Sequence, residues 1–348
     1  MSADKRQVCG EWKRLGGKLT GDIMKIYIGI DMAKDKFDYC AMDDALNILC
    51  RGTGKGYWVG APSACYSENN NKFYIAYRVR APHGSEKSRG HCCEIAESED
   101  GVKFDTLCKV TADSLNTKSI EKSALFCEGD TFSLYISYVD PNTSKWRIDL
   151  IRTSDPANFN VEKRVPVVNS ENLLSEGVKD PCVFKLAGTY YMMATYIPNY
   201  ELIPDSELHK ISDASAIGLA QVYTVLLSSM DGIHFKKEHD VLQPGSNWDK
   251  LSAVGTAVMY SEPWFVIFYD GRRDASDSYE GKAALAVTRD FVNVKKLDLF
   301  APRFRSPYAS GSLRYVDVVQ LDGRAYYYYE FAREDGSHEL RVNVEEDL

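Results

Sequence analysis

The chain has 348 residues, 12% aromatic side chains and a formal net charge of -8. Acidic and basic residues are mixed along it, without the basic face that phosphate binding requires, so nucleic acid is excluded as the main partner. No apolar run approaches the length of a membrane span, and the polar first residues do not resemble a signal peptide, so we expect no contact with a membrane.

The nine cysteines all lie within the first 182 residues. A disulfide framework usually shows an even count in a short secreted chain, so we predict reduced thiols and a cytoplasmic location. The six histidines lack zinc-ligand spacing, and we predict neither a metal nor a cofactor. The oligomeric state is left open.

Residues 24–51 differ in character from the rest of the chain and contain the motif Gly-Ile-Asp at residues 29–31. This stretch resembles the opening of insertion-sequence transposases that carry an Asp-Glu-Asp-Asp metal site in a ribonuclease-H-like domain. The resemblance makes Asp31 the counterpart of the first metal ligand. A two-metal nuclease needs carboxylates from several strands around one site, and the rest of such a domain is missing. We therefore interpret residues 1–52 as an N-terminal extension with a transposase-like fragment.

From Trp58 onward the chain repeats one plan: a short apolar strand, a tight turn and an aromatic-rich returning strand. Residues 177–196 show it most clearly. A third strand of alternating character follows each hairpin, and an Asp-bearing turn ends four of these five strands. A repeat of roughly 60 residues without helical periodicity predicts an all-β fold, a five-bladed β-propeller over residues 53–348. The hairpin turns are centred near Asn70, Gly129, Gly188, Glu262 and Gly323.

An insertion, Pro198–Gln221, lengthens the spacing between the third and fourth hairpins. It falls between the second and third strands of the third repeat. Both a plain surface insertion and a lid over a site fit its position.

In a propeller blade, the start of the first strand and the end of the second open on the same face. The position of a residue in the repeat therefore predicts whether its side chain lies on that face of the propeller. Most of the residues at these positions are charged, which favours a polar site, although solvated rim charges would look the same. The candidate carboxylates are Asp180, Asp270 and Glu330, with Glu280, Asp317 and Glu121 as further acids. The candidate substrate-binding residues are Trp58, Arg78, Lys122, Tyr196, Arg272, Arg314 and Asp317.

The five-repeat plan resembles the five-bladed propeller glycosidases, the superfamily that includes glycoside hydrolase families 43, 32, 68, 117 and 130. Residues 178–193 resemble the Arg-Asp-Pro motif of the invertase and levansucrase group, in which the Asp stabilises the charged sugar transition state. Residues 268–291 resemble the fourth-blade segment of many members. The chain also departs from the pattern. Ala61 precedes Pro62 where relatives have Asp, the third-blade Glu has no clear counterpart, and Asp180 falls in the third repeat rather than the second.

Glycosidic cleavage needs two carboxyl groups, about 5–5.5 Å apart for retention or about 6.5–9.5 Å for inversion. One of them must have a raised pKa so that it stays protonated as the general acid. The guanidinium group of arginine binds carboxylates and phosphates through two parallel hydrogen bonds. The candidate arginines therefore favour an anionic sugar or phosphorolysis. Ion pairs that hold the blades together would give the same pattern. We expect hydrolysis or phosphorolysis of a small glycoside in the central funnel. The alternative is a non-catalytic propeller that binds a carbohydrate or a protein, which Ala61 favours.

Overall fold

The computed structural model describes residues 47–52, 54–82, 84–85, 89–198, 220–277 and 280–346. This part of the chain is almost entirely β-structure, so the prediction of an all-β fold is confirmed. The transposase-like residues 24–46, with Asp31, and residues 199–219 of the insertion lie outside the described residues. The described helices are single turns: η1 (Val161–Lys163), α3 (Ser170–Leu173) and η3 (Ala275–Asp277).

The described strands form one 12-stranded sheet and two 4-stranded sheets. The first 4-stranded sheet consists of β6 (Ala124–Glu128), β7 (Thr131–Val139), β8 (Trp146–Thr153) and β9 (Val165–Val168), and the second of β10 (Val178–Leu186), β11 (Thr189–Tyr196), β12 (Tyr223–Ser229) and β13 (Lys236–Leu242). The 12-stranded sheet contains β2 (Trp58–Ser67), β3 (Lys72–Ala81), β4 (Arg89–Ser98), β5 (Asp105–Thr111), β14 (Ser252–Ser261), β15 (Trp264–Arg272), β16 (Lys282–Thr288), β17 (Lys295–Lys296), β18 (Leu313–Leu321), β19 (Arg324–Ala332), β20 (His338–Glu346) and β1 (Asn47–Arg51).

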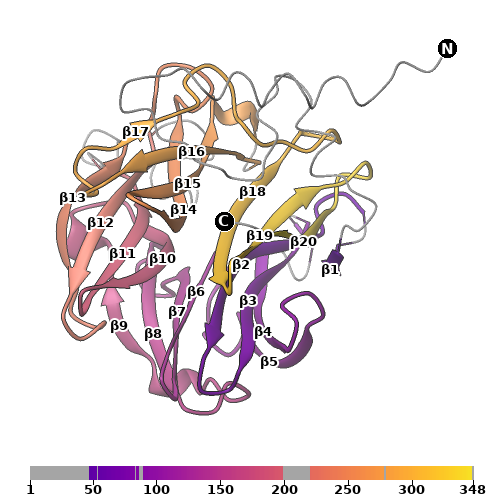
Figure 1. Cartoon of the computed structure of the whole chain (residues 1–348), viewed down its shortest axis with the longest axis vertical. Coiled ribbons are helices and arrows are strands. Elements are labelled where there is room, and N and C mark those ends of the chain that lie inside the picture. Colours follow the sequence, from indigo (N-terminus) through magenta and orange to yellow (C-terminus); the bar gives the residue numbers. More distant parts are fainter. Residues whose placement is uncertain are drawn as a thin grey trace.

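All five predicted hairpins are present, and their turns lie where the sequence places them. The predicted third strands are also present, as β4, β8, β12, β16 and β20. Figure 1 shows the strands following one another around a common centre, with the last strands beside the first. The number of blades stays a prediction, because single residue pairs join β16 to β18 and β20 to β2 within the large sheet.

Strand β1 lies inside the predicted N-terminal extension, yet it pairs antiparallel with β20. Residues 47–51 therefore belong to the same sheet as the last hairpin. The assignment of residues 1–52 to an N-terminal extension stays a prediction, since residues 1–46 lie outside the described part.

The Asp-bearing turns after the third strands share one hydrogen-bonding pattern. After β12, the Ser229 hydroxyl accepts hydrogen bonds from the backbone of Asp231 and Gly232, and Asp231 accepts from the next two backbone N–H groups. Asp100 and Asp290 accept in the same way after β4 and β16. The side chains thereby satisfy turn N–H groups that the strands leave unpaired.

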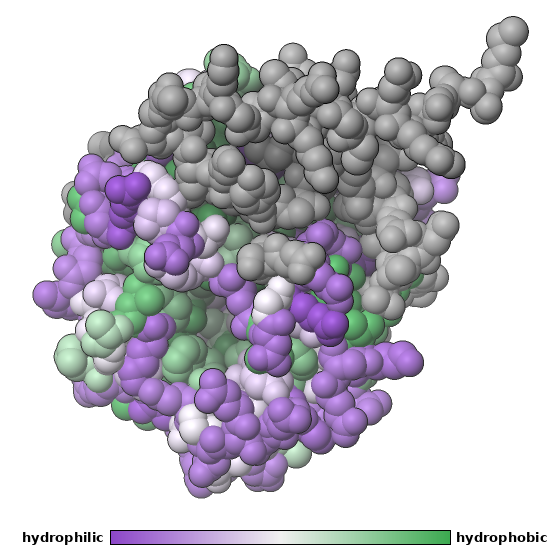
Figure 2. All heavy atoms as spheres, in the orientation of Figure 1, coloured by the Kyte–Doolittle hydropathy of each residue, from purple (hydrophilic) through white to green (hydrophobic). Residues whose placement is uncertain are grey.

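Buried aromatic and aliphatic side chains fill the space between neighbouring sheets. Tyr135, Phe268 and Tyr328, for example, are almost completely buried. Burying a large apolar side chain contributes about 1.5–3 kcal/mol, which explains why the returning strands are rich in aromatic residues. On the face in Figure 2, hydrophilic residues dominate the lower rim of the described part and apolar surface appears mostly inside it.

The prediction of reduced thiols is wrong for two cysteines, because Cys65 on β2 and Cys127 on β6 form a disulfide. They are 62 residues apart in sequence, and folding brings their Cα atoms to 6.1 Å. Spacing along the chain does not reveal this proximity, since it depends on which edges of the two sheets meet. The cytoplasmic location stays a prediction. In the described part, no helix has both the length and the apolar character of a membrane span.

Candidate active site

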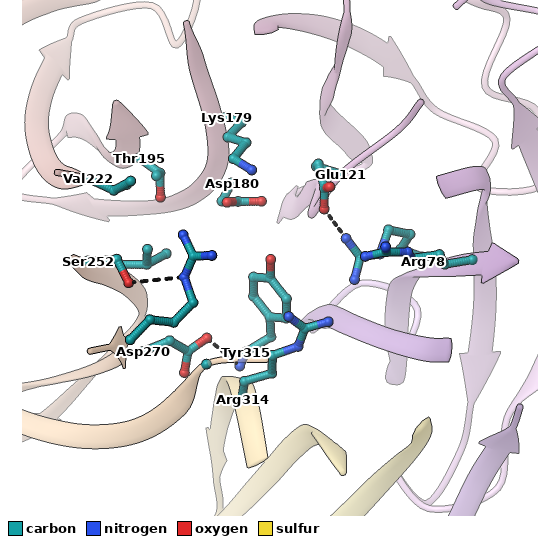
Figure 3. Close-up of a pocket in the computed structure, with 14 residues that line it drawn as sticks. Arg78, Glu121, Lys179, Asp180, Thr195, Val222, Ser252, Asp270, Arg314 and Tyr315 are labelled. Atoms are coloured by element: carbon teal, nitrogen blue, oxygen red, sulfur yellow. Dashed lines mark hydrogen bonds and ion pairs between the residues drawn. The ribbon is translucent and has the colours of Figure 1, made fainter. Parts of the chain in front are cut away.

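A pocket opens where the first strands of several hairpins meet, with about 530 Å³ of empty space that is partly open to solvent. Figure 3 shows its charged side chains arriving from different sheets. The pocket is lined by Arg78, Arg80, Glu121, Lys179, Asp180, Thr195, Val222, Ser252, Val254, Asp270, Arg272, Gly281, Arg314 and Tyr315.

Three first strands carry the same local irregularity. The register of β2, β10 and β18 with their hairpin partners shifts near the strand start, and each has one left-handed residue there. These residues are Ala61, Asp180 and Tyr315, with φ of 51°, 53° and 52°. A bulge redirects a side chain, and the left-handed conformation costs a non-glycine residue roughly 1–2 kcal/mol. The three are therefore equivalent positions along their strands, and two of them, Asp180 and Tyr315, line the pocket.

Asp180 is 2% exposed and occupies this position on β10. Its Oδ1 atom accepts no hydrogen bond from any described residue, although a buried acceptor normally has a partner. Figure 3 shows the carboxylate beside Lys179, facing the middle of the pocket. The orphaned oxygen marks a place where a ligand hydroxyl can donate.

Asp270 lies near the end of β15, where its Oδ2 atom accepts a hydrogen bond of 2.8 Å from the Tyr315 backbone N–H. Its Oδ1 atom, like that of Asp180, has no partner among the described residues. Burial, with smaller contributions from Glu330 and Asp180, raises the pKa of Asp270 to about 7, although the Tyr315 N–H and Arg314 oppose the shift. A carboxyl group with this pKa can donate a proton near neutral pH.

Glu330 is completely buried and is absent from the pocket lining. Its Oε1 atom accepts from Arg314 Nη2 at 2.6 Å and from His338 Nδ1 at 2.6 Å, and its Oε2 atom lies 3.5 Å from Arg78 Nη2. Burial alone would raise the pKa of Glu330, but Arg314, His338 and Arg78 together hold it well below its usual range. Gly60 leaves the space for this side chain, since a Cβ atom there would lie 2.3 Å from Glu330. Glu330 thus stays ionised and holds two arginines in place.

The basic residues of the lining outnumber its acids. Arg78 forms a buried ion pair with Glu121. The Arg80 guanidinium lies 4.1 Å from the centre of the Trp58 ring, and burial, reinforced by Arg78 and Arg314, lowers the pKa of Arg80 to about 9. Concentrated positive charge in a partly desolvated pocket favours an anionic ligand.

The structure divides the predicted site residues among several places. Asp180, Asp270, Arg78, Arg272 and Arg314 line the pocket. Trp58 is absent from the lining and stacks on His338, with the ring centres 4.3 Å apart.

Three other predicted binding residues also lie away from this pocket. Lys122 and Asp317 line a second cavity, where Lys122 Nζ donates to the Pro181 carbonyl and Asp317 accepts from the Ala64 N–H. The Tyr196 hydroxyl hydrogen-bonds Asp240.

Lys179, Thr195 and Tyr315 are among the lining residues that were not candidates. Tyr315 had a signal in the sequence, because it lies near the start of the fifth repeat as Asp180 does in the third. Lys179 and Thr195 had none beyond being neighbours of candidate residues. In the part of the chain that the structure describes, no group of three or more His, Cys, Asp or Glu side chains is placed to hold a metal ion.

No family model matches the chain, and no curated protein matches it. Solved structures do match. A thermostable family-43 glycoside hydrolase aligns with a TM-score of 0.59 and 14% identity over 85% of this chain and 91% of its own. A β-xylosidase aligns with a TM-score of 0.57 and 12% identity over 83% of this chain and 92% of its own. The β-1,2-mannobiose phosphorylase from Listeria innocua aligns with a TM-score of 0.54 and 14% identity over 87% of this chain and 91% of its own.

These likenesses show that the chain shares its fold with these solved structures, one of which is a family-43 glycoside hydrolase. They confirm, at the level of fold, the resemblance on which the sequence prediction relied.

Proposed function

We propose that this protein is a five-bladed propeller enzyme that cleaves a small glycoside in the pocket of Asp180 and Asp270. The observation that carries the proposal is a pair of buried aspartates, each with an oxygen that lacks a described partner, in one pocket lined by basic residues. The structural neighbours reported above are two glycosidases and a glycoside phosphorylase, which supports cleavage of a glycosidic bond as the reaction.

Asp270 acts as the general acid. Its pKa of about 7 leaves a large fraction protonated at neutral pH, so it can protonate the glycosidic oxygen as the bond breaks. Asp180 faces the same space and supplies the second carboxyl group that the reaction requires. Glu330, the third predicted carboxylate, instead holds Arg314 and Arg78 at the edge of the pocket.

The excess of basic residues favours a substrate that carries a carboxylate or phosphate, or an inorganic phosphate that attacks in place of water. Arg272 and Arg314 line the pocket together with Lys179, and guanidinium groups bind such anions through paired hydrogen bonds. Hydrolysis and phosphorolysis are separated by whether turnover requires added phosphate.

The test is a panel of aryl glycosides and oligosaccharides, including uronic acids, assayed with and without phosphate. Asp270→Asn and Asp180→Asn should each lower the rate by about 10²–10⁴-fold while the protein stays folded. Asp317→Asn is the matched comparison, because Asp317 is also a carboxylate on a first strand but is only partly buried and lies at the second cavity. Loss of activity confined to Asp317→Asn would move the site to that cavity.

The second candidate is a non-catalytic propeller that binds a carbohydrate or a protein. Ala61 favours it, because the position equivalent to Asp180 in the first hairpin has no carboxyl group. Sugar binding by calorimetry without turnover of any substrate in the panel would establish this reading and refute the enzyme.

A further inference from the structure

Tyr315 is the third of the equivalent left-handed residues, and the only aromatic side chain in the described lining of the pocket. A bulky residue is a marked outlier in this conformation. Strained backbone of this kind persists where the surrounding structure imposes it, and it often coincides with functional sites. The fold thus presents a phenol where β10 presents the carboxylate of Asp180 and β2 presents only the methyl group of Ala61.

The surroundings of Tyr315 connect it to every part of the proposed site. Its ring lies 4.9 Å from the Arg314 guanidinium and 5.6 Å from that of Arg78. Its backbone N–H holds Asp270 at 2.8 Å. Figure 3 shows its hydroxyl directed toward Asp180 in the middle of the pocket.

The protonation of Tyr315 agrees with this arrangement. Burial and then the charge of Asp180 raise the pKa of the Tyr315 phenol, while Arg314 and Arg78 act in the opposite direction. The phenol therefore stays neutral at rest and needs a base to release its proton. Because the hydroxyl faces Asp180 in Figure 3, we assign Asp180 as that base, and the two guanidinium groups would stabilise the phenolate that forms.

A neutral nucleophile also suits the charge of the pocket. If the basic residues hold an anionic group of the sugar close to the reacting carbon, a carboxylate nucleophile would be repelled by that group, whereas a phenol would not. We infer that Tyr315 is the catalytic nucleophile, forming a covalent aryl glycoside with a sugar that carries an anionic group. This inference rests on the proposed function and assigns it a retaining mechanism.

The first step forms a bond between Tyr315 Oη and the anomeric carbon. The bond from that carbon to the glycosidic oxygen breaks, and its electron pair stays on the departing oxygen, which takes the proton of Asp270. The phenolic proton passes to Asp180.

In the second step, the oxygen of water bonds to the anomeric carbon and gives a proton to Asp270. The bond between the anomeric carbon and Oη breaks, and the phenolate takes its proton back from Asp180. The net change is glycoside plus water to sugar plus alcohol, with Asp180, Asp270 and Tyr315 restored. Where phosphate is the acceptor, it replaces water in this step.

The direct test uses the wild-type chain and the dinitrophenyl 2-deoxy-2-fluoro glycosides of the panel sugars, which slow the second step. We expect inactivation and a mass increase of one fluoroglycosyl group on the peptide that contains Tyr315. The product of an ordinary substrate should retain its anomeric configuration by NMR. A label on Asp180, or an inverted product, would overturn the inference while leaving the proposed function intact.

Substitution provides the second measurement. Tyr315→Phe should lower kcat by at least about 100-fold, with an unchanged circular dichroism spectrum and little change in KM. The control is Tyr327→Phe, on β19 of the same hairpin, whose buried hydroxyl donates to the Met259 sulfur and lies outside the pocket lining. Full activity of Tyr315→Phe would refute the nucleophile, whereas absence of turnover by the wild type on every substrate would refute both the nucleophile and the enzyme.

Discussion

Replacing Glu330 with glutamine tests whether this residue positions the arginines or takes part in the chemistry. The Glu330 carboxylate is fully buried and accepts from Arg314 Nε at 2.9 Å and from Arg314 Nη2 at 2.6 Å. His338 Nδ1 lies 2.6 Å from the same oxygen. Glutamine has nearly the same shape but no charge, so Arg314 and His338 would lose their anionic partner inside the protein.

The size of the effect follows from that burial. Removing one partner of a buried ion pair costs about 3–5 kcal/mol, because the remaining charge is left without compensation. Arg78 is less affected, since it also pairs with Glu121. With about 2.1 cal/mol/K of unfolding entropy per residue and roughly 300 folded residues, about 4 kcal/mol corresponds to a fall in Tm of about 6 °C.

Differential scanning calorimetry measures the fall, and kinetics below the transition separate the two roles. If Glu330 only positions arginines, the folded variant should keep its rate within about tenfold of the wild type, whereas loss of a general acid or base would cost about 10²–10⁴. Glu128→Gln is the control, because the exposed pair of Glu128 with Lys185 should contribute less than about 1 kcal/mol. A Tm of Glu330→Gln equal to that of the wild type would refute the structural role.

Three further predictions follow from individual contacts. Burial raises the pKa of Asp270 from 3.8 to about 7, so its contribution to stability is complete below pH 3.8 and is lost as the pH rises through about 7. Chemical denaturation should show this decline in the wild type and not in Asp270→Asn, and kcat/KM should fall above about pH 7. Gly60→Ala should destabilise the protein by about 1–3 kcal/mol in urea unfolding, because the new methyl group would clash with Glu330. Removal of the Cys65–Cys127 disulfide by Cys65→Ser should cost about 2–4 kcal/mol, and an equal Tm with and without reductant would contradict it.

The hairpins could be predicted because local chemistry decides them. Aromatic and β-branched residues alternate through the strands, and turn residues such as Gly188 and Gly323 adopt positive φ between them. These signals lie within a few residues of each other, so they can be recognised in a single sequence without an alignment. Which hairpins join into one sheet depends instead on isolated residue pairs between neighbouring hairpins, such as the single pair between Trp58 and His338, and such pairs have no signature in the local sequence.

The carboxylates show where position along a strand stops being informative. Asp180, Asp270 and Glu330 all lie near strand ends, and the sequence treats them alike. Their environments differ: two have an oxygen without a described partner at the pocket, whereas Glu330 is surrounded by Arg314 and His338. That difference arises from side chains of distant strands, which is why the sequence could nominate all three but could not separate their roles.

Ala61 shows that the sequence alone also leaves the consequence of a missing carboxylate undecided. The sequence marks it as a missing carboxylate, and that absence favours a binding protein if catalysis requires an acid at this position. The structure shows that the same left-handed bulge occurs in β2, β10 and β18 and holds Ala61, Asp180 and Tyr315. Equivalent positions on three first strands, two of which line the pocket, allow a reactive group to move from one strand to another without a change of fold. The alanine therefore excludes only a mechanism that depends on the first hairpin, and it leaves room for one in which β18 supplies the nucleophile.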